Sequence, residues 1–291
     1  MKSTHTSQPH PKVSVLIIVY NSEKTLRTCL DSVCNQTYTN YEVIIVDSST
    51  TNLSKNIILE YMAVHPQIRY IFEQKKIRGF ARNISVQAAS GDILVTTDSD
   101  CIVPHDWIEN ITKPIREEGE KAVQGFESDL IGNYWTKHVQ EADWCFLKER
   151  TEGNYIHIID TKNFAISADI LKKYLFDPLI HHGEDSELYL RIKEVYKIRF
   201  CPDIRLGHTH PSTFKAVVKK NVDRASEYEK RMKSHPRELS EDKMMLKNMK
   251  LRSIIPFLLW TPLQFLRRSP GDAFFVIVSD AAWRWGLLRK S

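Results

Sequence analysis

The chain has 291 residues, of which 42% are hydrophobic and 26% are charged, and its formal net charge is +5. This composition supports a sizeable core and excludes a disordered or fibrous protein. The length fits about two domains or one large α/β domain, and so small a net charge gives no reason to expect a nucleic-acid partner.

The first predicted elements are strands. Apolar, largely β-branched runs of the kind found in strands buried on both faces occupy residues 13–20, 41–46, 68–72 and 93–97. Patterns that predict helices lie between these strands, at 26–33, 53–64 and 80–89. Each repeat has the length of a strand, a crossover helix and two turns. We therefore expect a parallel, doubly wound sheet that binds its ligand at the carboxyl ends of the strands.

The second half of the chain is less regular. A strand is predicted near 121–126, and helices are predicted near 133–150, 167–174, 184–195 and 212–233. The net positive charge of the chain lies in residues 212–252, which hold 12 Lys or Arg against 6 Asp or Glu, while the rest of the chain is close to neutral. The apolar stretch 254–266 comes next and is interrupted by two prolines.

The chain lacks the usual signals for secretion or membrane insertion. Residues 1–12 are polar, contain two prolines and are expected to be disordered. No apolar run reaches the ~18 residues of a simple spanning helix. The five cysteines form no CxxC pair and no zinc spacing, which is typical of reduced thiols. We therefore expect a cytoplasmic protein.

A glycine-rich phosphate-binding loop is also missing. A dinucleotide-binding fold needs glycines after its first strand, where this chain has Asn21-Ser22-Glu23. Asp98-Ser99-Asp100, directly after a buried strand, offers another way to hold phosphates. Its carboxylates are hard oxygen ligands suited to Mg²⁺ or Mn²⁺, and such a cation could bridge a diphosphate. The alternative is an ordinary loop turn.

Two further polar residues face the same predicted crevice. Asp47 ends the second strand and could bind a base or ribose, or could instead cap a helix or form an Asx-turn. Arg82 begins a helix and could pair with phosphate or with an aspartate of the metal loop. The alternative for Arg82 is a surface ion pair.

The adjacent acids Glu184 and Asp185 begin a predicted helix. Such a pair gains from the helix dipole, so a purely structural role is the alternative. Because the two charges repel, one pKa can be raised, and an ionised carboxylate could serve as a general base.

The histidines permit a second type of site. The pairs His181-His182 and His208-His210, together with nearby acids, could build a transition-metal hydrolase site, but no HExxH spacing is present. A surface position is the alternative for the first pair, and a buried, hydrogen-bonded ring is the alternative for His208.

Taken together, these motifs resemble family 2 glycosyltransferases of the inverting, bacterial and archaeal type with the GT-A fold. The resemblance begins with VSVLIIVYNSEKTLRTCLDSV, YEVIIVDSST and GFARNISVQAASGDILVTTDSD. The family usually has Asp-Gly-Ser after the second strand, where this chain has Asp47-Ser48-Ser49. The second half adds Thr161–Ile166, Phe176-Asp177, Gly183–Leu188 and Gly207–His210, so the resemblance covers about residues 13–211.

The resemblance implies a metal-dependent transfer of sugar from a nucleotide-diphosphate sugar, most often a UDP-sugar, to an acceptor hydroxyl with inversion. It implies Asp185 as general base with Glu184 positioning the acceptor, and a Mn²⁺ or Mg²⁺ ion on Asp98, Asp100 and His208. The residues it implies for the nucleotide sugar are Val19, Asn21, Asp47, Arg82, Asp98 and Ser99. The expected fold is a Rossmann-like GT-A domain with a mostly parallel sheet and a C-terminal helical segment.

The expected domains are a catalytic domain, 13–211, with nucleotide-binding (13–107) and acceptor (108–211) halves, and a C-terminal region, 212–291. We expect this region to bind a cytoplasmic membrane face through its basic and apolar segments, with a soluble helical subdomain or a dimer contact as the alternative. The acceptor would be a glycan or a lipid-linked glycan in cell-surface glycan, polysaccharide or glycolipid assembly. Two rival functions are a sugar nucleotidyltransferase, for which the basic glycine-rich loop is missing, and a non-catalytic scaffold, which would not need the acids.

Overall fold

The computed structural model describes residues 10–180, 183–234 and 269–288. The chain forms two compact units. The sheet unit contains the chain up to Ser128 together with Leu147–His208, and the helical unit contains Asp129–Phe146 and the chain from Thr209 onward.

The parallel half of the sheet matches the sequence prediction. Its strands are β1 (Val13–Val19), β2 (Tyr41–Asp47), β3 (Ile68–Phe72) and β4 (Ile93–Asp98). They are parallel and lie in the order β3-β2-β1-β4. The central strands β1 and β2 are buried almost throughout, which explains why their sequences are continuously apolar.

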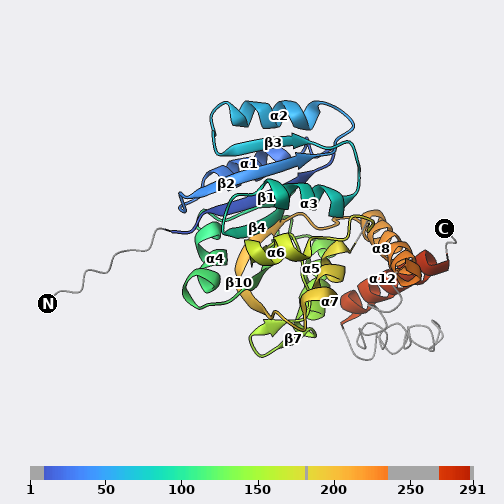
Figure 1. The fold of residues 1–291 in the computed structure, drawn as a ribbon. Coiled ribbons are helices and arrows are strands. Elements are labelled where there is room, and N and C mark those ends of the chain that lie inside the picture. Colours follow the sequence, from blue (N-terminus) through green and yellow to red (C-terminus); the bar gives the residue numbers. More distant parts are fainter. Residues whose placement is uncertain (1–9, 181–182, 235–268, 289–291) are drawn as a thin grey trace. The chain divides into compact units, whose positions relative to one another are not determined.

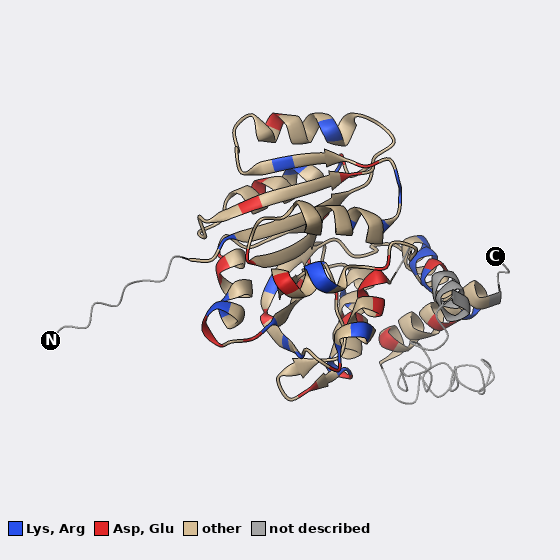
Figure 2. Ribbon diagram, in the orientation of Figure 1, with Lys and Arg blue, Asp and Glu red and all other residues tan. Residues whose placement is uncertain are grey.

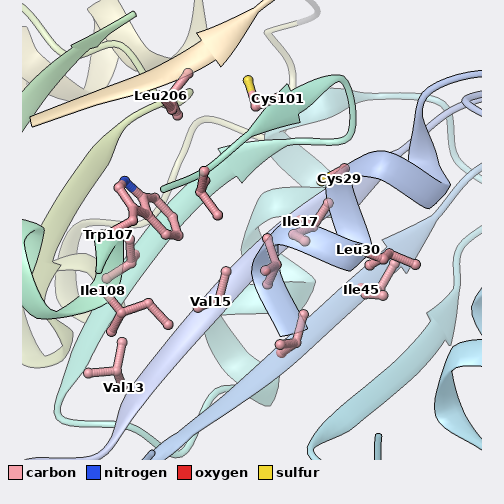
Figure 3. Packing of buried hydrophobic residues seen from close by; sticks show 14 of the residues in the cluster. Val13, Val15, Ile17, Cys29, Leu30, Ile45, Cys101, Trp107, Ile108 and Leu206 are labelled. Carbon is pink, nitrogen blue, oxygen red and sulfur yellow. The ribbon is translucent and has the colours of Figure 1, made fainter. Parts of the chain in front are cut away.

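Helices cover both faces of this half (Figure 1). The connecting helices are α1 (Leu26–Cys34), α2 (Leu53–Met62) and α3 (Arg78–Ala88). One face forms the main core, in which Val15 and Ile17 of β1 pack with Leu30 of α1 and with Trp107 and Ile108 of α4 (Trp107–Glu117) (Figure 3). Burying these side chains supplies most of the stabilisation of the sheet, at about 1.5–3 kcal/mol for each large one.

An antiparallel half extends the sheet beyond β4 in the order β4-β9-β6-β10-β8-β7. Its strands are β6 (Ala122–Asp129), β7 (Thr151–Glu152), β8 (Tyr155–Ile156), β9 (Phe164–Ser167) and β10 (Ile198–His208). The short β5 (Cys101–Ile102) pairs with β10, and the helices α6 (Ala168–Tyr174) and α7 (Glu184–Ile192) complete the unit. The predicted strand near 121–126 is confirmed, whereas α4, β9 and β10 were not predicted from the sequence.

The helical unit contains most of α5 (Tyr134–Lys148) together with α8 (Phe214–Ser234) and α12 (Pro270–Leu288). Helices α8 and α12 pack side by side (Figure 1), and a side chain at Gly286 would collide with Val222 and Ala225. Trp135 of α5 joins Phe214 and Phe275 in a small aromatic core. The apolar stretch 254–266 lies outside the described residues, and no described helix has the length and apolar character needed to cross a bilayer.

A tight backbone crossing in the sheet unit gives a stability prediction. A Cβ atom on Gly125 would lie 2.3 Å from Asn163 Nδ2 and 2.6 Å from the Ile204 carbonyl oxygen. The Asn163 amide cannot move away, because it donates to the Phe126 and Ile204 carbonyls and accepts from Trp107 Nε1. We expect Gly125→Ala to lower the free energy of unfolding by about 1–3 kcal/mol, as overpacking does.

Denaturant unfolding of the two glycine variants checks this prediction. The control is Gly271→Ala, at the start of α12, where the new methyl group would make ordinary van der Waals contacts with Tyr134 at 3.6 Å and Ser269 Oγ at 4.0 Å. The control should keep wild-type stability. Equal stability of the wild type and Gly125→Ala would contradict the packing at this crossing.

Candidate active site

The carboxyl ends of the parallel strands bring three predicted residues to one edge of the sheet. Val19 is in register with Asp47, and Ile18 is in register with Asp98. Because the strands are parallel, Val19, Asp47 and Asp98 share the edge at which ligands bind in open α/β sheets.

Arg82 of α3 connects this edge to the second half of the unit. Its side chain is almost fully buried, and Nε donates to Glu184 Oε1 at 3.0 Å while Nη2 donates to Asp98 Oδ1 at 3.3 Å. Burial alone lowers the pKa of Arg82, but the Asp98 and Glu184 carboxylates outweigh it and raise the pKa. The Arg82 side chain is therefore buried rather than part of a surface ion pair, and it pairs with Asp98.

Helix α7 presents the predicted acid pair. Gly183 precedes it with a positive φ of 81°, a backbone conformation that favours glycine. Glu184 is buried against Arg82, whereas Asp185 accepts a hydrogen bond from the Ser186 amide at 2.7 Å. Burial raises the pKa of Asp185 to about 7, and repulsion from Glu184 and Asp160 adds to the effect. The two carboxylates therefore have different partners, Arg82 for Glu184 and the Ser186 amide for Asp185.

His208 of β10 lies among acids. Its Nε2 is 3.7 Å from Asp100 Oδ2, and its Nδ1 is 3.1 Å from Glu127 Oε2. Burial alone lowers the pKa of His208, but Asp100 and Glu127 outweigh it and raise the pKa to about 9. Glu127 also pairs with Lys162 at 2.9 Å. Neither Glu127 nor Lys162 was given a role from the sequence, although Glu127 directly follows the predicted strand near 121–126 and Lys162 lies in the segment Thr161–Ile166.

Asp98, Asp100 and His208 are side chains of the types that bind a divalent cation. Asp98 and Asp100 have side chains 33% and 45% exposed, so their oxygens are accessible. Carboxylate oxygens and an imidazole nitrogen are ligands that Mn²⁺ accepts, and Mg²⁺ prefers the oxygens. His208 carries a proton at neutral pH, which a bound cation would displace.

Asp47 and Asn21, both predicted to bind the nucleotide, are held by hydrogen bonds from neighbouring residues. Asp47 is buried, and its two oxygens accept hydrogen bonds from the Ser49 amide at 2.9 Å and the Tyr70 hydroxyl at 3.3 Å. This is the Asx-turn considered as the alternative role. Asn21, with a positive φ of 50°, accepts from the Thr50 amide at 2.9 Å.

Ser99 and three histidines complete the set of residues named from the sequence. Ser99 lies between Asp98 and Asp100, and its hydroxyl is 2.7 Å from the Ser22 hydroxyl. His181 and His182 lie outside the described residues. His210 is buried, in the helical unit.

The mixed α/β sheet with its flanking helices is the architecture of the GT-A fold. A mannosyltransferase from Pyrobaculum calidifontis, solved with GDP-Man and Mn²⁺, superimposes with a TM-score of 0.71 at 18% identity, covering 96% of this chain and 88% of that one. Residues 14–175 match the glycosyl transferase family 2 profile, and the chain belongs to this family.

Curated relatives share the family region. Glycosyltransferase GlyA of Streptococcus pneumoniae is 32% identical over 136 residues, which is 46% of this chain and 18% of GlyA. The putative glycosyltransferase EpsH of Bacillus subtilis is 32% identical over 120 residues, which is 41% of this chain and 35% of EpsH. The chain therefore spans about a third or less of these relatives' lengths.

Proposed function

We propose that this chain is an inverting glycosyltransferase that moves a sugar from a nucleotide-diphosphate sugar, in the first instance a UDP-sugar, to an acceptor hydroxyl. The observation that carries the proposal is the bridge made by Arg82 between Asp98 and Glu184. It unites the acidic loop after β4 with the acid pair of α7, although Arg82 and Glu184 are 102 residues apart in the chain.

The acids have separate roles in this proposal. Asp185 takes the proton from the acceptor hydroxyl, and its raised pKa suits a base working near neutral pH. Glu184 accepts from Arg82 and positions the acceptor. Val19, Asn21, Asp47, Arg82, Asp98 and Ser99 hold the nucleotide sugar.

Asp98, Asp100 and His208 would hold a Mn²⁺ or Mg²⁺ ion. When bound, such an ion neutralises charge on the diphosphate and so stabilises the leaving group. A relative solved with UDP, TarS of Staphylococcus aureus (TM-score 0.54, 15% identity), and the mannosyltransferase solved with GDP-Man and Mn²⁺ make UDP and GDP the first nucleotides to test.

The domains 13–211 and 212–291 and the membrane contact of the second domain remain part of the proposal. The start of α8 carries four cations, Lys215, Lys219, Lys220 and Arg224, against one acid, Asp223 (Figure 2). Lys219 pairs with Asp223, and Lys220 and Arg224 pair with Asp143, so the positive charge that remains is small but supports contact with anionic lipid. Such contact would place the chain beside a lipid-linked or glycan acceptor at the cytoplasmic face of the membrane.

A transfer assay tests the proposal. The full chain is incubated with UDP- and GDP-sugars, Mn²⁺ and glycan acceptors, and the product is analysed by NMR. Transfer with inversion at the anomeric carbon is the expected result. Transfer with retention, or no transfer from any donor by the folded protein, would contradict the proposal.

The pH dependence of the same assay is a separate prediction. Because Asp185 must be ionised and its pKa is raised to about 7, kcat/KM should fall as the pH drops below about 7. Glu184→Gln removes a neighbouring charge that raises this pKa, so the decline of kcat/KM should begin at a lower pH. The matched control, Glu187→Gln in the same helix, removes the partner of Arg191 and should leave the pH of the decline unchanged. An unchanged pH of decline in Glu184→Gln would argue against Asp185 as the titrating base.

A further inference from the structure

A pocket of about 580 Å³ lies in the sheet unit, outside the candidate active site. It is formed by α4, the loop before it and residues 203–205 of β10. None of the four acids in the predicted metal and catalytic motifs lines it. Its volume lies within the range of small-molecule binding sites.

The polar lining carries no net charge. It consists of two carboxylates, two cationic groups and one amide, from Asp106, Asp203, Lys113, Arg205 and Asn110. A site for phosphate would carry an excess of cations, and a site for a cation would carry an excess of carboxylates. A ligand with several neutral groups that both donate and accept hydrogen bonds matches this lining, and hydroxyl groups have that property.

Most of these side chains are available for a ligand. Within the described parts of the chain, the side chains of Asp106, Asn110, Lys113 and Asp203 take part in no hydrogen bond or ion pair. Arg205, in contrast, is held in place, because Nε donates to the Pro202 carbonyl at 3.0 Å and the guanidinium lies over the Phe126 ring at 5.4 Å.

Apolar groups complete the lining. Pro104, Pro114 and Ile204 contribute apolar groups to the wall of the pocket. Trp107 also borders the pocket but is only 1% exposed, so it supports the wall, with Nε1 donating to Asn163 Oδ1 at 2.9 Å, and presents almost no surface to a ligand. A ligand with both apolar C–H faces and hydroxyl groups, such as a pyranose ring, meets both kinds of surface.

The strands place this pocket at a useful distance from the candidate metal residues. Ile102 and Cys101 of β5 pair with Gly207 and His208 of β10. Residues 203–205 precede His208 by three to five positions on the same strand, which corresponds to about 10–17 Å at ~3.3 Å per residue. A short oligosaccharide spans such a distance.

We propose that this pocket binds a neutral saccharide unit of the acceptor glycan, remote from the sugar that reacts. This inference rests on the proposed function for the identity of the glycan as acceptor. The binding itself needs neither nucleotide nor metal.

Binding is tested first with the full chain in the absence of nucleotide and metal. The probes are neutral oligosaccharides of glucose, mannose and N-acetylglucosamine, measured by titration calorimetry. At least one series should bind, and Asp203→Ala and Asn110→Ala should each raise Kd by about tenfold or more through loss of hydrogen bonds. Asp169→Ala, an exposed acid on α6 outside the lining, is the matched control and should bind as the wild type does. Asp185→Asn, which alters the proposed base, should also retain binding.

A kinetic readout follows where transfer is observed. Asp203→Ala should raise KM for an oligosaccharide acceptor and leave kcat unchanged. Failure of the folded wild type to bind any of these oligosaccharides, or binding that survives both pocket variants, would overturn the inference while leaving the proposed function standing. Binding lost in the pocket variants, in a chain that transfers no sugar, would support the pocket and refute the proposed function.

Discussion

Replacing Asp185 with asparagine is expected to reduce sugar transfer about 10²–10⁴-fold, the usual contribution of a general base. The amide has nearly the shape of the carboxylate but cannot take a proton from the acceptor. Nucleotide binding should persist, because Asp185 contributes no hydrogen bond to Arg82, which pairs with Glu184 and Asp98.

Steady-state kinetics and a parallel nucleotide-binding measurement check this prediction. Asp169→Asn makes the same chemical change at an exposed position of α6 and should transfer sugar at the wild-type rate. A rate for Asp185→Asn within a few-fold of wild type would rule out Asp185 as the base.

Replacing Arg82 with methionine should have the largest effect on stability. The substitution leaves the carboxylate of Glu184 buried, at 2% exposure, without its cationic partner. Removing one member of a buried ion pair typically costs about 3–5 kcal/mol, and we expect a loss of stability of that size. Asp98 contributes less to this cost, because its side chain is 33% exposed.

The double variant Arg82→Met/Glu184→Gln separates stability from function. It removes the uncompensated charge, so it should recover part of the lost stability while remaining inactive. Chemical denaturation of the single and double variants measures this recovery. Wild-type stability in Arg82→Met would show that the buried pair is not formed.

The parallel half of the fold was predictable because its signals are local. Strands β1, β2 and β4 are continuous apolar runs, and equal spacing implied the helices between them. Strand β10 was missed because Pro202 and Asp203 interrupt its pattern, and proline removes a hydrogen-bond donor from a strand. Helix α4 was missed although Trp107, Ile108 and Ile111 lie at helical spacing, because Pro114 lies within it.

The residues of the candidate site likewise include some that local sequence signals predict and some that they do not. Asp98 and Asp47 follow from their places at strand ends, and Glu184-Asp185 from its place at a helix start. The contact of Arg82 with Glu184 joins two helices that are far apart in the chain. The group formed by Glu127, Lys162 and His208 depends on the order in which β9, β6 and β10 lie in the sheet. Hydrophobic periodicity carries no information about which distant strands pair, so these partners could not be assigned from the sequence.

In the proposed function, the acidic edge of the sheet holds a nucleotide diphosphate with a divalent cation. Thermal-shift measurements of the full chain with UDP, GDP and dTDP, with and without Mn²⁺, test this binding. We expect one nucleotide to raise the melting temperature only when Mn²⁺ is present, because ligand that binds only the folded state stabilises it. The double variant Asp98→Asn/Asp100→Asn should fold and lose this shift, while Asp169→Asn should keep it. No shift with any nucleotide in the folded wild type, or a full shift in the Asp98→Asn/Asp100→Asn variant, would contradict the proposed binding.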